Sequence, residues 1–186
     1  DSRITCASAN VARATTNSGR TRRDRNPKYT SSNAATSRAK ISAELRRLLR
    51  PNTKAILICA PHNPTGYLYD ADAWNEIIAI ARHHGLILFS DEVYRGLEHD
   101  PSRRLPHMAD VYERGLSLNC LSKSSGLAGL RIGWIATQDR GLYESLATFK
   151  DYLTICNSAP SEFLARIAVG HMDALFARHR ARLVRN

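Results

Sequence analysis

Two short runs of apolar, β-favouring residues constrain the fold of this chain most. Residues 54–60 read Lys-Ala-Ile-Leu-Ile-Cys-Ala, and residues 86–89 read Leu-Ile-Leu-Phe. Neither run alternates polar with apolar residues, which is typical of strands buried on both faces of a parallel sheet. Residues 70–85, which lie between them, have the spacing of an amphipathic helix. Asp70 or Asp72 would cap this helix, and Gly85 would end it.

Helices and strands continue to alternate along the rest of the chain. Residues 41–49 follow helical spacing up to Pro51, residues 100–114 contain two prolines and predict a loop or short helix, and residues 116–121 and 132–137 predict two more strands. Asp139 would cap a helix that runs to Leu153, and Ser158 or Ser161 would open a last helix. The predicted core positions of that last helix are Leu164, Ile167, Ala168, Leu175 and Leu183. The pattern predicts an α/β fold with a mostly parallel sheet and flanking helices.

The first 38 residues differ in composition from the rest. Residues 1–50 hold 12 Lys or Arg against 3 Asp or Glu, and so account for most of the net charge of +10. Because residues 1–38 have almost no large apolar side chains, we predict a basic, disordered and largely irregular segment there, followed by an α/β domain over residues 39–186. The arginine-rich run at 20–25 is compatible with nucleic-acid contacts. A solvated arm is the favoured interpretation, since only Tyr29 offers a base a stacking partner.

The cysteines and the hydropathy bear on the compartment. Four cysteines lie far apart with no Cys-x-x-Cys pair, which favours reduced thiols in the cytoplasm over a disulfide framework or a zinc site. No apolar segment reaches the roughly 20 residues that a membrane span needs. The sequence also contains no metal-ligand spacing, no Gly-x-Ser-x-Gly elbow and no Walker loop, which argues against metalloenzymes, hydrolases and nucleotidases.

Polar residues follow the ends of three predicted strands. Asn63 follows the first, Asp91 and Tyr94 the second, and Lys123 the third. Ligands of open α/β sheets bind beyond the carboxyl ends of the strands, so we expect these side chains along one edge. Each also has an ordinary interpretation: a turn residue for Asn63, a cap or an ion pair with Arg95 for Asp91, and packing for Tyr94. Glu92 we interpret as structural.

Lys123 has a setting that the other four lysines lack. It stands at the end of an apolar run and precedes a Ser/Gly turn. A lysine that forms a Schiff base needs a partly desolvated amine, because burial disfavours the ammonium form. Arg131, eight residues later, suits a phosphate group. The alternative is a solvated lysine in a loop between two strands.

Three motifs in this order carry a resemblance. They are Asn63-Pro64-Thr65-Gly66, Asp91-Glu92-Val93-Tyr94, and Ser122-Lys123 followed by Gly129-Leu130-Arg131-Ile132-Gly133. From about Pro51 to its C-terminus the chain resembles the class I and II aminotransferases, fold-type I enzymes that use pyridoxal 5′-phosphate. The resemblance implies transamination between an amino acid and a 2-oxo acid, and homodimers are typical of this fold.

The resemblance also implies roles for individual residues. Lys123 would hold the cofactor as a Schiff base and act as general base, and Asp91 would keep the pyridine nitrogen protonated. Asn63 and Tyr94 would hydrogen-bond the phenolic oxygen of the cofactor ring. Val93 would pack on a ring face, while Arg131 and Ser122 would hold the phosphate. Lys123, Asp91 and Tyr94 are therefore the expected catalytic residues.

The chain departs from the family pattern in several places. Cys120 stands where the family commonly has a phosphate-binding serine, and residues 1–50 show neither the phosphate loop nor the stacking aromatic residue of the family. We expect the small C-terminal domain to be absent and the last helix to be a truncated inter-domain helix. We therefore expect part of a large domain, with impaired activity. The alternatives are other fold-type I chemistry, such as that of a carbon–sulfur lyase, a synthase or a cyclase, and a non-catalytic interaction module with a basic arm.

Overall fold

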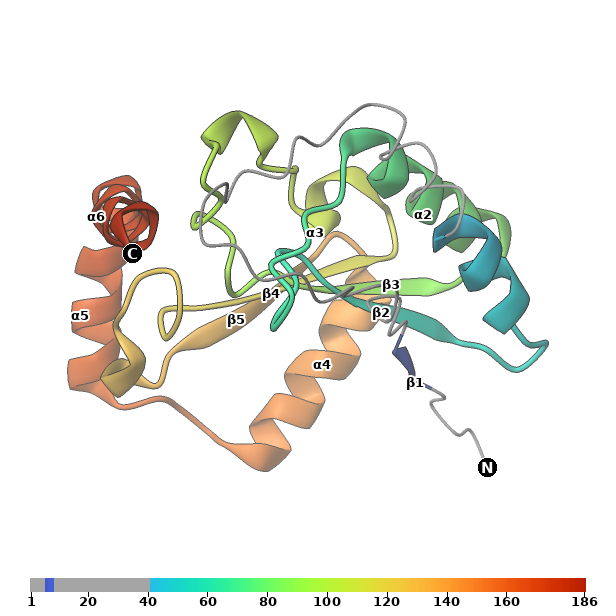
Figure 1. Ribbon diagram of the computed structural model, residues 1–186. Helices are drawn as coiled ribbons and strands as arrows, with labels where there is room; N and C mark the ends of the chain where they lie inside the picture. The colour runs from blue at the N-terminus through green and yellow to red at the C-terminus, as the bar shows by residue number, and fades with distance from the viewer. Residues whose placement is uncertain (1–5, 9–40) are drawn as a thin grey trace.

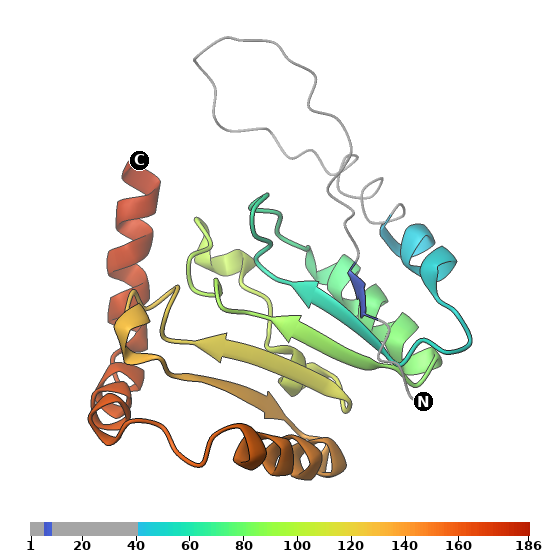
Figure 2. The same cartoon turned by 90° about the horizontal axis from the view of Figure 1, so that it is seen from below.

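A five-stranded sheet forms the centre of the protein. The computed structural model describes residues 6–8 and 41–186. The strands lie in the order β1-β2-β3-β4-β5, with bounds Cys6–Ser8, Ala55–Cys59, Ile87–Asp91, Gly115–Cys120 and Gly133–Thr137. Strands β1 to β4 are parallel, and β5 runs antiparallel to β4 (Figure 2). The predicted α/β fold with a mostly parallel sheet is confirmed, while β1 was not predicted.

Helices lie on both faces of this sheet. Figure 1 shows α2 on one face and α4 on the other. A helix covers residues 41–48, and the remaining elements are α2 (Ala71–His83), η1 (Pro101–Arg103), α3 (Met108–Val111), η2 (Ala128–Leu130), α4 (Arg140–Leu153), α5 (Ala159–Val169) and α6 (Met172–Arg185). None of these helices in the described part of the chain is long and apolar enough to cross a membrane.

The helix starts follow from local side-chain hydrogen bonds. Asp70 caps α2 by accepting from the Ala73 amide at 2.7 Å, and Asp139 caps α4 by accepting from the Leu142 amide at 3.0 Å. Each cap satisfies a backbone donor that the first turn of a helix leaves without a partner. Both caps agree with the sequence prediction. The remaining residues predicted as disordered, 1–5 and 9–38, lie outside the described part of the chain.

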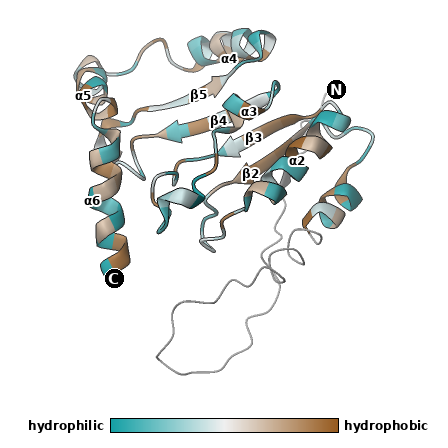
Figure 3. Cartoon of the chain, turned by 90° about the horizontal axis from the view of Figure 1, so that it is seen from above, coloured by the Kyte–Doolittle hydropathy of each residue, from teal (hydrophilic) through white to brown (hydrophobic). Residues whose placement is uncertain are grey.

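The main core lies between the sheet and α2. Ile56 and Leu88 from the strands and Ile80 from α2 are fully buried (0% exposed). The hydroxyl of Tyr112 also lies in this layer and donates to the backbone oxygen of Leu86 at 2.6 Å, so the phenol has a partner despite its burial. Figure 3 shows that β2 is uniformly hydrophobic, whereas hydrophobic and hydrophilic residues alternate along α6. The apolar runs in the sequence thus became the central strands.

The C-terminal helices differ from the prediction. The predicted single helix is broken at Gly170 and His171 into α5 and α6. Three of its predicted core positions are exposed instead: Leu164 and Ile167 at 49% each and Leu183 at 44%. Ala168 is buried and packs with Leu121 in a second, small cluster. The break turns α6 away from the axis of α5, so one continuous apolar stripe cannot face the sheet (Figure 1).

Candidate active site at the edge of the sheet

One edge of the sheet gathers the predicted site residues. The carboxyl ends of β2, β3 and β4 meet at this edge, which we call the rim (Figure 2). Asn63 follows β2, Asp91 ends β3, and Lys123 follows β4. Because β5 is antiparallel, it begins where β4 ends, which returns the chain to the rim at Arg131.

Three side chains from three rim loops converge here. The amide nitrogen of Asn63 donates to the hydroxyl of Tyr94 at 3.1 Å. The amine of Lys123 lies 5.9 Å from the centroid of the Tyr94 ring, within the range of a cation–π contact. The Asn63 loop is closed by the Gly66 amide, which donates to the backbone oxygen of His62 at 2.8 Å. Asn63, Tyr94 and Lys123 thus form one group, as the positions after the strands predict.

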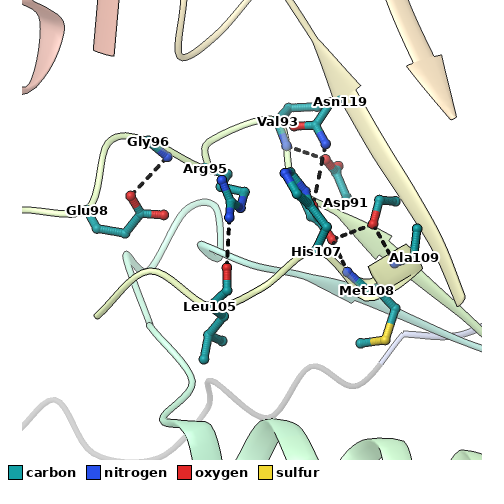
Figure 4. A network of polar contacts seen from close by, with 12 residues as sticks. Asp91, Val93, Arg95, Gly96, Glu98, Leu105, His107, Met108, Ala109 and Asn119 are labelled. Carbon is teal, nitrogen blue, oxygen red and sulfur yellow. Dashed lines mark hydrogen bonds and ion pairs between the residues drawn. The ribbon is translucent and has the colours of Figure 1, made fainter. Parts of the chain in front are cut away.

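Asp91 takes part in a turn at the end of β3. One of its carboxylate oxygens accepts from the Val93 amide at 3.2 Å (Figure 4). Among the described residues, no donor contacts its other carboxylate oxygen. The alternative ion pair with Arg95 is wrong, because Arg95 is directed to the backbone oxygen of Leu105 at 3.1 Å. Asp91 therefore has one oxygen available to a ligand.

Hydrogen bonds join the turn that carries Lys123 to the residues that follow β3. The amide and the hydroxyl of Ser124 both donate to the backbone oxygen of Val93, at 3.3 and 2.7 Å. Ser124 is 3% exposed. We did not identify this residue from the sequence, and the Ser-Ser pair directly after the lysine was the available signal. Ser124 sets the separation between the loops that hold Lys123 and Tyr94.

The environment of Lys123 differs from the expected one. Its side chain is exposed rather than partly desolvated. The apolar residues that predicted burial are directed elsewhere, since Leu121 and Ile132 pack into the second cluster against α5. Within the described residues the Lys123 amine makes no hydrogen bond or ion pair, and it interacts there with the face of the Tyr94 ring.

Ser122 and Arg131 lie near the other site residues in the chain or at the rim, but the described part of the structure does not bond them to those residues. No hydrogen bond or ion pair within residues 41–186 joins either of them to Asn63, Asp91, Tyr94 or Lys123. Arg131 adopts a left-handed conformation with φ of 56°, which is uncommon for a residue other than glycine. One nitrogen of its guanidinium donates to the Ala128 oxygen at 3.1 Å. The remaining donors of the exposed guanidinium are left for an anion.

Glu92 lies on the other face of the sheet from Asp91. Successive residues of a strand alternate between faces, so the two acidic side chains point apart. Glu92 is 2% exposed and accepts from the Met108 amide at 2.9 Å and the Ser117 hydroxyl at 2.8 Å. Burial acts to raise the pKa of Glu92, but hydrogen bonds from His107, Met108 and Ser117 outweigh it and lower this pKa below its ordinary value. The structural interpretation of Glu92 is consistent with these contacts, although its partners were not identifiable from the sequence.

Comparisons with known proteins agree on the family. Residues 23–181 match the family described as aminotransferase class I and II. Capreomycidine synthase from Streptomyces vinaceus is 35% identical over 148 residues, which cover 76% of this chain and 37% of the relative. The probable N-succinyldiaminopimelate aminotransferase from Mycobacterium tuberculosis is 33% identical over 135 residues, covering 72% of this chain and 34% of the relative.

A solved structure gives the same result for the fold. The crystal structure of a PLP-dependent aminotransferase from Streptococcus suis superimposes with a TM-score of 0.71 at 35% identity, covering 77% of this chain and 37% of that one. This chain thus spans little more than a third of the length of these relatives. The family match begins at residue 23, so the expectation that the likeness starts near Pro51 was too narrow. The match extends over most of the chain, and the protein belongs to the class I and II aminotransferases.

Proposed function

We propose that the rim binds pyridoxal 5′-phosphate and serves the transfer of an amino group from an amino acid to a 2-oxo acid. The observation that carries the proposal is the convergence of Asn63, Tyr94 and Lys123. An amide and a phenol 3.1 Å apart can both hydrogen-bond one ligand oxygen, and a free amine lies next to the same ring. These groups suit the ring oxygen and the aldehyde carbon of that cofactor. Family membership supports the same assignment.

The remaining residues fit the other parts of the cofactor. The unoccupied carboxylate oxygen of Asp91 would accept from a protonated pyridine nitrogen. Arg131 would bind the phosphate through donors that Ala128 does not use, with Ser122 as a further donor. Val93 would pack against a ring face. When bound, the cofactor supplies an electron-accepting ring that stabilises negative charge on the substrate α-carbon.

Lys123 would serve in two ways. Its amine would hold the cofactor, and the same amine, when free, would take the proton from the substrate α-carbon and hold it at Nζ. Tyr94 would act next to it, because its ring faces this amine. Lys123, Asp91 and Tyr94 are therefore the proposed catalytic residues.

The wider organisation is proposed on the same basis. Residues 39–186 would be part of a cofactor-binding large domain. Apolar side chains exposed on and after α4, among them Tyr152 at 89% and Ile155 at 85%, are of a kind that a second subunit or another part of a longer protein covers. A homodimer and a cytoplasmic location are proposed with it.

A second candidate function is supported by one relative. Capreomycidine synthase is 35% identical to this chain, so a synthase or cyclase reaction with the same lysine, aspartate and arginine is the alternative. The two reactions differ in the fate of the amino group. The protein is incubated with pyridoxal 5′-phosphate, a 2-oxo acid and an amino acid that carries an isotopic label on its α-amino nitrogen. Only transamination moves this labelled nitrogen onto the 2-oxo acid, so the position of the label distinguishes the two reactions.

Cofactor trapping tests the site itself. The protein is titrated with pyridoxal 5′-phosphate, reduced with borohydride and digested, and the modified peptide is identified by mass spectrometry. We expect the label on Lys123 and its loss in Lys123→Ala. Lys150→Ala is the control, because Lys150 is also a surface lysine but lies on α4 and donates to the Ile155 oxygen. Label on another lysine, or none, would contradict the proposal.

A further inference from the structure

Glu92 is a buried carboxylate surrounded by donors from two other elements. Its Oε1 atom accepts from the Met108 amide at the start of α3 and from the Ser117 hydroxyl of β4. Its Oε2 atom contacts Nδ1 of His107 and lies 3.4 Å from the Asn119 amide nitrogen. Figure 4 shows His107, Met108 and Asn119 gathered beside the end of β3.

This arrangement suits a charged carboxylate. Four donors meet two oxygens, and an ionised carboxylate only accepts hydrogen bonds. With the carboxylate ionised, the His107 ring donates to Oε2 from a protonated Nδ1. A glutamine in the same place would have one oxygen and would present two N–H donors to some of the same partners. The chemistry of the group, and not only its size, thus matters here.

The backbone of Glu92 is fixed as firmly as its side chain. Its amide donates to the Leu118 oxygen of β4 at 2.9 Å, and its carbonyl accepts from the Arg95 amide at 2.9 Å. Ser117 also accepts from the Ala109 amide at 3.0 Å, which links α3 to β4 through the same hydroxyl. These bonds restrain the backbone of the residues on either side, Asp91 and Val93.

We propose that Glu92, together with His107, is a positioning residue that holds the Asp91–Tyr94 segment in the geometry the cofactor needs. The proposal rests on the proposed function. Asp91 contacts Val93 on the rim side, while Glu92 is anchored on the opposite face, so one buried cluster fixes where the rim carboxylate and the Tyr94 ring lie. Loosening the cluster shifts both groups relative to Lys123.

Glu92→Gln tests this with two readouts. In the protein without cofactor, the NMR shift of the Val93 amide reports its hydrogen bond to Asp91, and it is compared in His107→Gln, because a substitution at Glu92 changes the shift of the amide that follows it by itself. With cofactor, the dissociation constant of pyridoxal 5′-phosphate and the absorbance maximum of the complex are measured at a temperature where circular dichroism shows a folded protein. We expect the Val93 amide shift to change and the dissociation constant to rise by about tenfold or more, because displacement of site groups by about 1 Å is costly.

Two further variants make the outcome decisive. Glu113→Gln is the matched control, since Glu113 is an exposed carboxylate paired with Arg82, and it should change neither readout. His107→Gln, at a side chain that is 37% exposed, replaces Glu92→Gln if that variant does not fold. A folded variant with a lower melting temperature, but with an unchanged Val93 shift and dissociation constant, would show a purely structural role and overturn the proposal.

The two hypotheses fail separately. If the unmodified protein does not bind pyridoxal 5′-phosphate, the proposed function fails, and the Val93 shift alone decides whether Glu92 positions the segment. If the unmodified protein binds the cofactor and the folded variants bind it equally well, the positioning role is refuted while the proposed function stands.

Discussion

The side-chain amide of Asn63 and the hydroxyl of Tyr94 meet at 3.1 Å, although 31 positions separate them in the chain. This hydrogen bond joins the loop after β2 to the loop after β3 at the rim. It also places two donors beside the Lys123 amine. Its contribution can be measured without knowing the substrate.

A double-mutant cycle isolates the Asn63–Tyr94 bond. Asn63→Ala and Tyr94→Phe should each lower the free energy of unfolding, and the two effects should be non-additive by about 0.5–1 kcal/mol, since a net protein hydrogen bond contributes about that much. Urea unfolding of both single variants and the double variant gives the coupling. Fully additive effects would show that the two groups do not interact in solution.

Alanine substitutions at three glycines distinguish the cost of backbone strain from the cost of steric overlap. Gly96 has φ of 97°, and an added Cβ would lie 2.5 Å from the Phe176 ring. Gly66 has φ of 69° with open space around it, and Gly129 has open space without a positive φ. We expect Gly66→Ala to cost about 1–2 kcal/mol, Gly96→Ala more than about 3 kcal/mol, and Gly129→Ala nothing measurable or a slight gain. Thermal unfolding of the three variants checks this order, which a similar loss at Gly129 would contradict.

Low pH should decrease the free energy of unfolding because it protonates Glu92. The pKa of this carboxyl is lower in the folded protein than its ordinary value of 4.5. A lowered pKa contributes stability that is present above the unfolded value and is lost as the pH falls through the folded value. The protein should therefore be more stable than Glu92→Gln at pH 7, by about 2 kcal/mol, and the difference should shrink toward pH 3. Urea unfolding at several pH values measures it, and a difference that stays constant with pH would exclude an ionised Glu92.

Ser124 offers a further test of loop spacing. Ser124→Ala removes the hydroxyl that donates to the Val93 oxygen and should cost about 0.5–1.5 kcal/mol of folding stability. It should also weaken binding of pyridoxal 5′-phosphate, because the Lys123 turn loses its link to β3. Ser145→Ala is the control, since Ser145 makes the same kind of bond within α4, away from the rim. Equal binding by both variants would exclude a role for Ser124 in loop spacing.

The strands and the first large helix were predictable because local signals agree there. Residues 55–59 and 87–91 form strands as predicted, although they are buried on one face and only half-buried on the other, and α2 lies between an aspartate cap and a glycine turn. The rim positions of Asn63, Asp91 and Lys123 followed from the strand ends alone. These features depend on nearest neighbours in the sequence, which is why a single sequence predicts them.

Features that depend on distant partners were not predictable. Nothing in residues 132–137 indicates that β5 runs antiparallel to β4. The exposure of Leu164 and Ile167 depends on what packs against α5, and the exposure of Lys123 depends on the direction its apolar neighbours take. The donors around Glu92 come from residues 15–27 positions later in the chain. Each of these is a tertiary contact that local periodicity does not encode.

Because β5 runs antiparallel to β4, the number of residues between Lys123 and Arg131 determines which side chains of β5 lie on each face of the sheet. Lys123 and Arg131 stand at opposite ends of one segment, and β5 begins just after Arg131. Deleting a single residue between them would therefore have one of two structural effects. Either the guanidinium is pulled about 3.3 Å along the edge, or β5 slips by one position and exchanges the faces of Trp134 and Ile135. The length of this segment is therefore constrained as strongly as its amino-acid sequence.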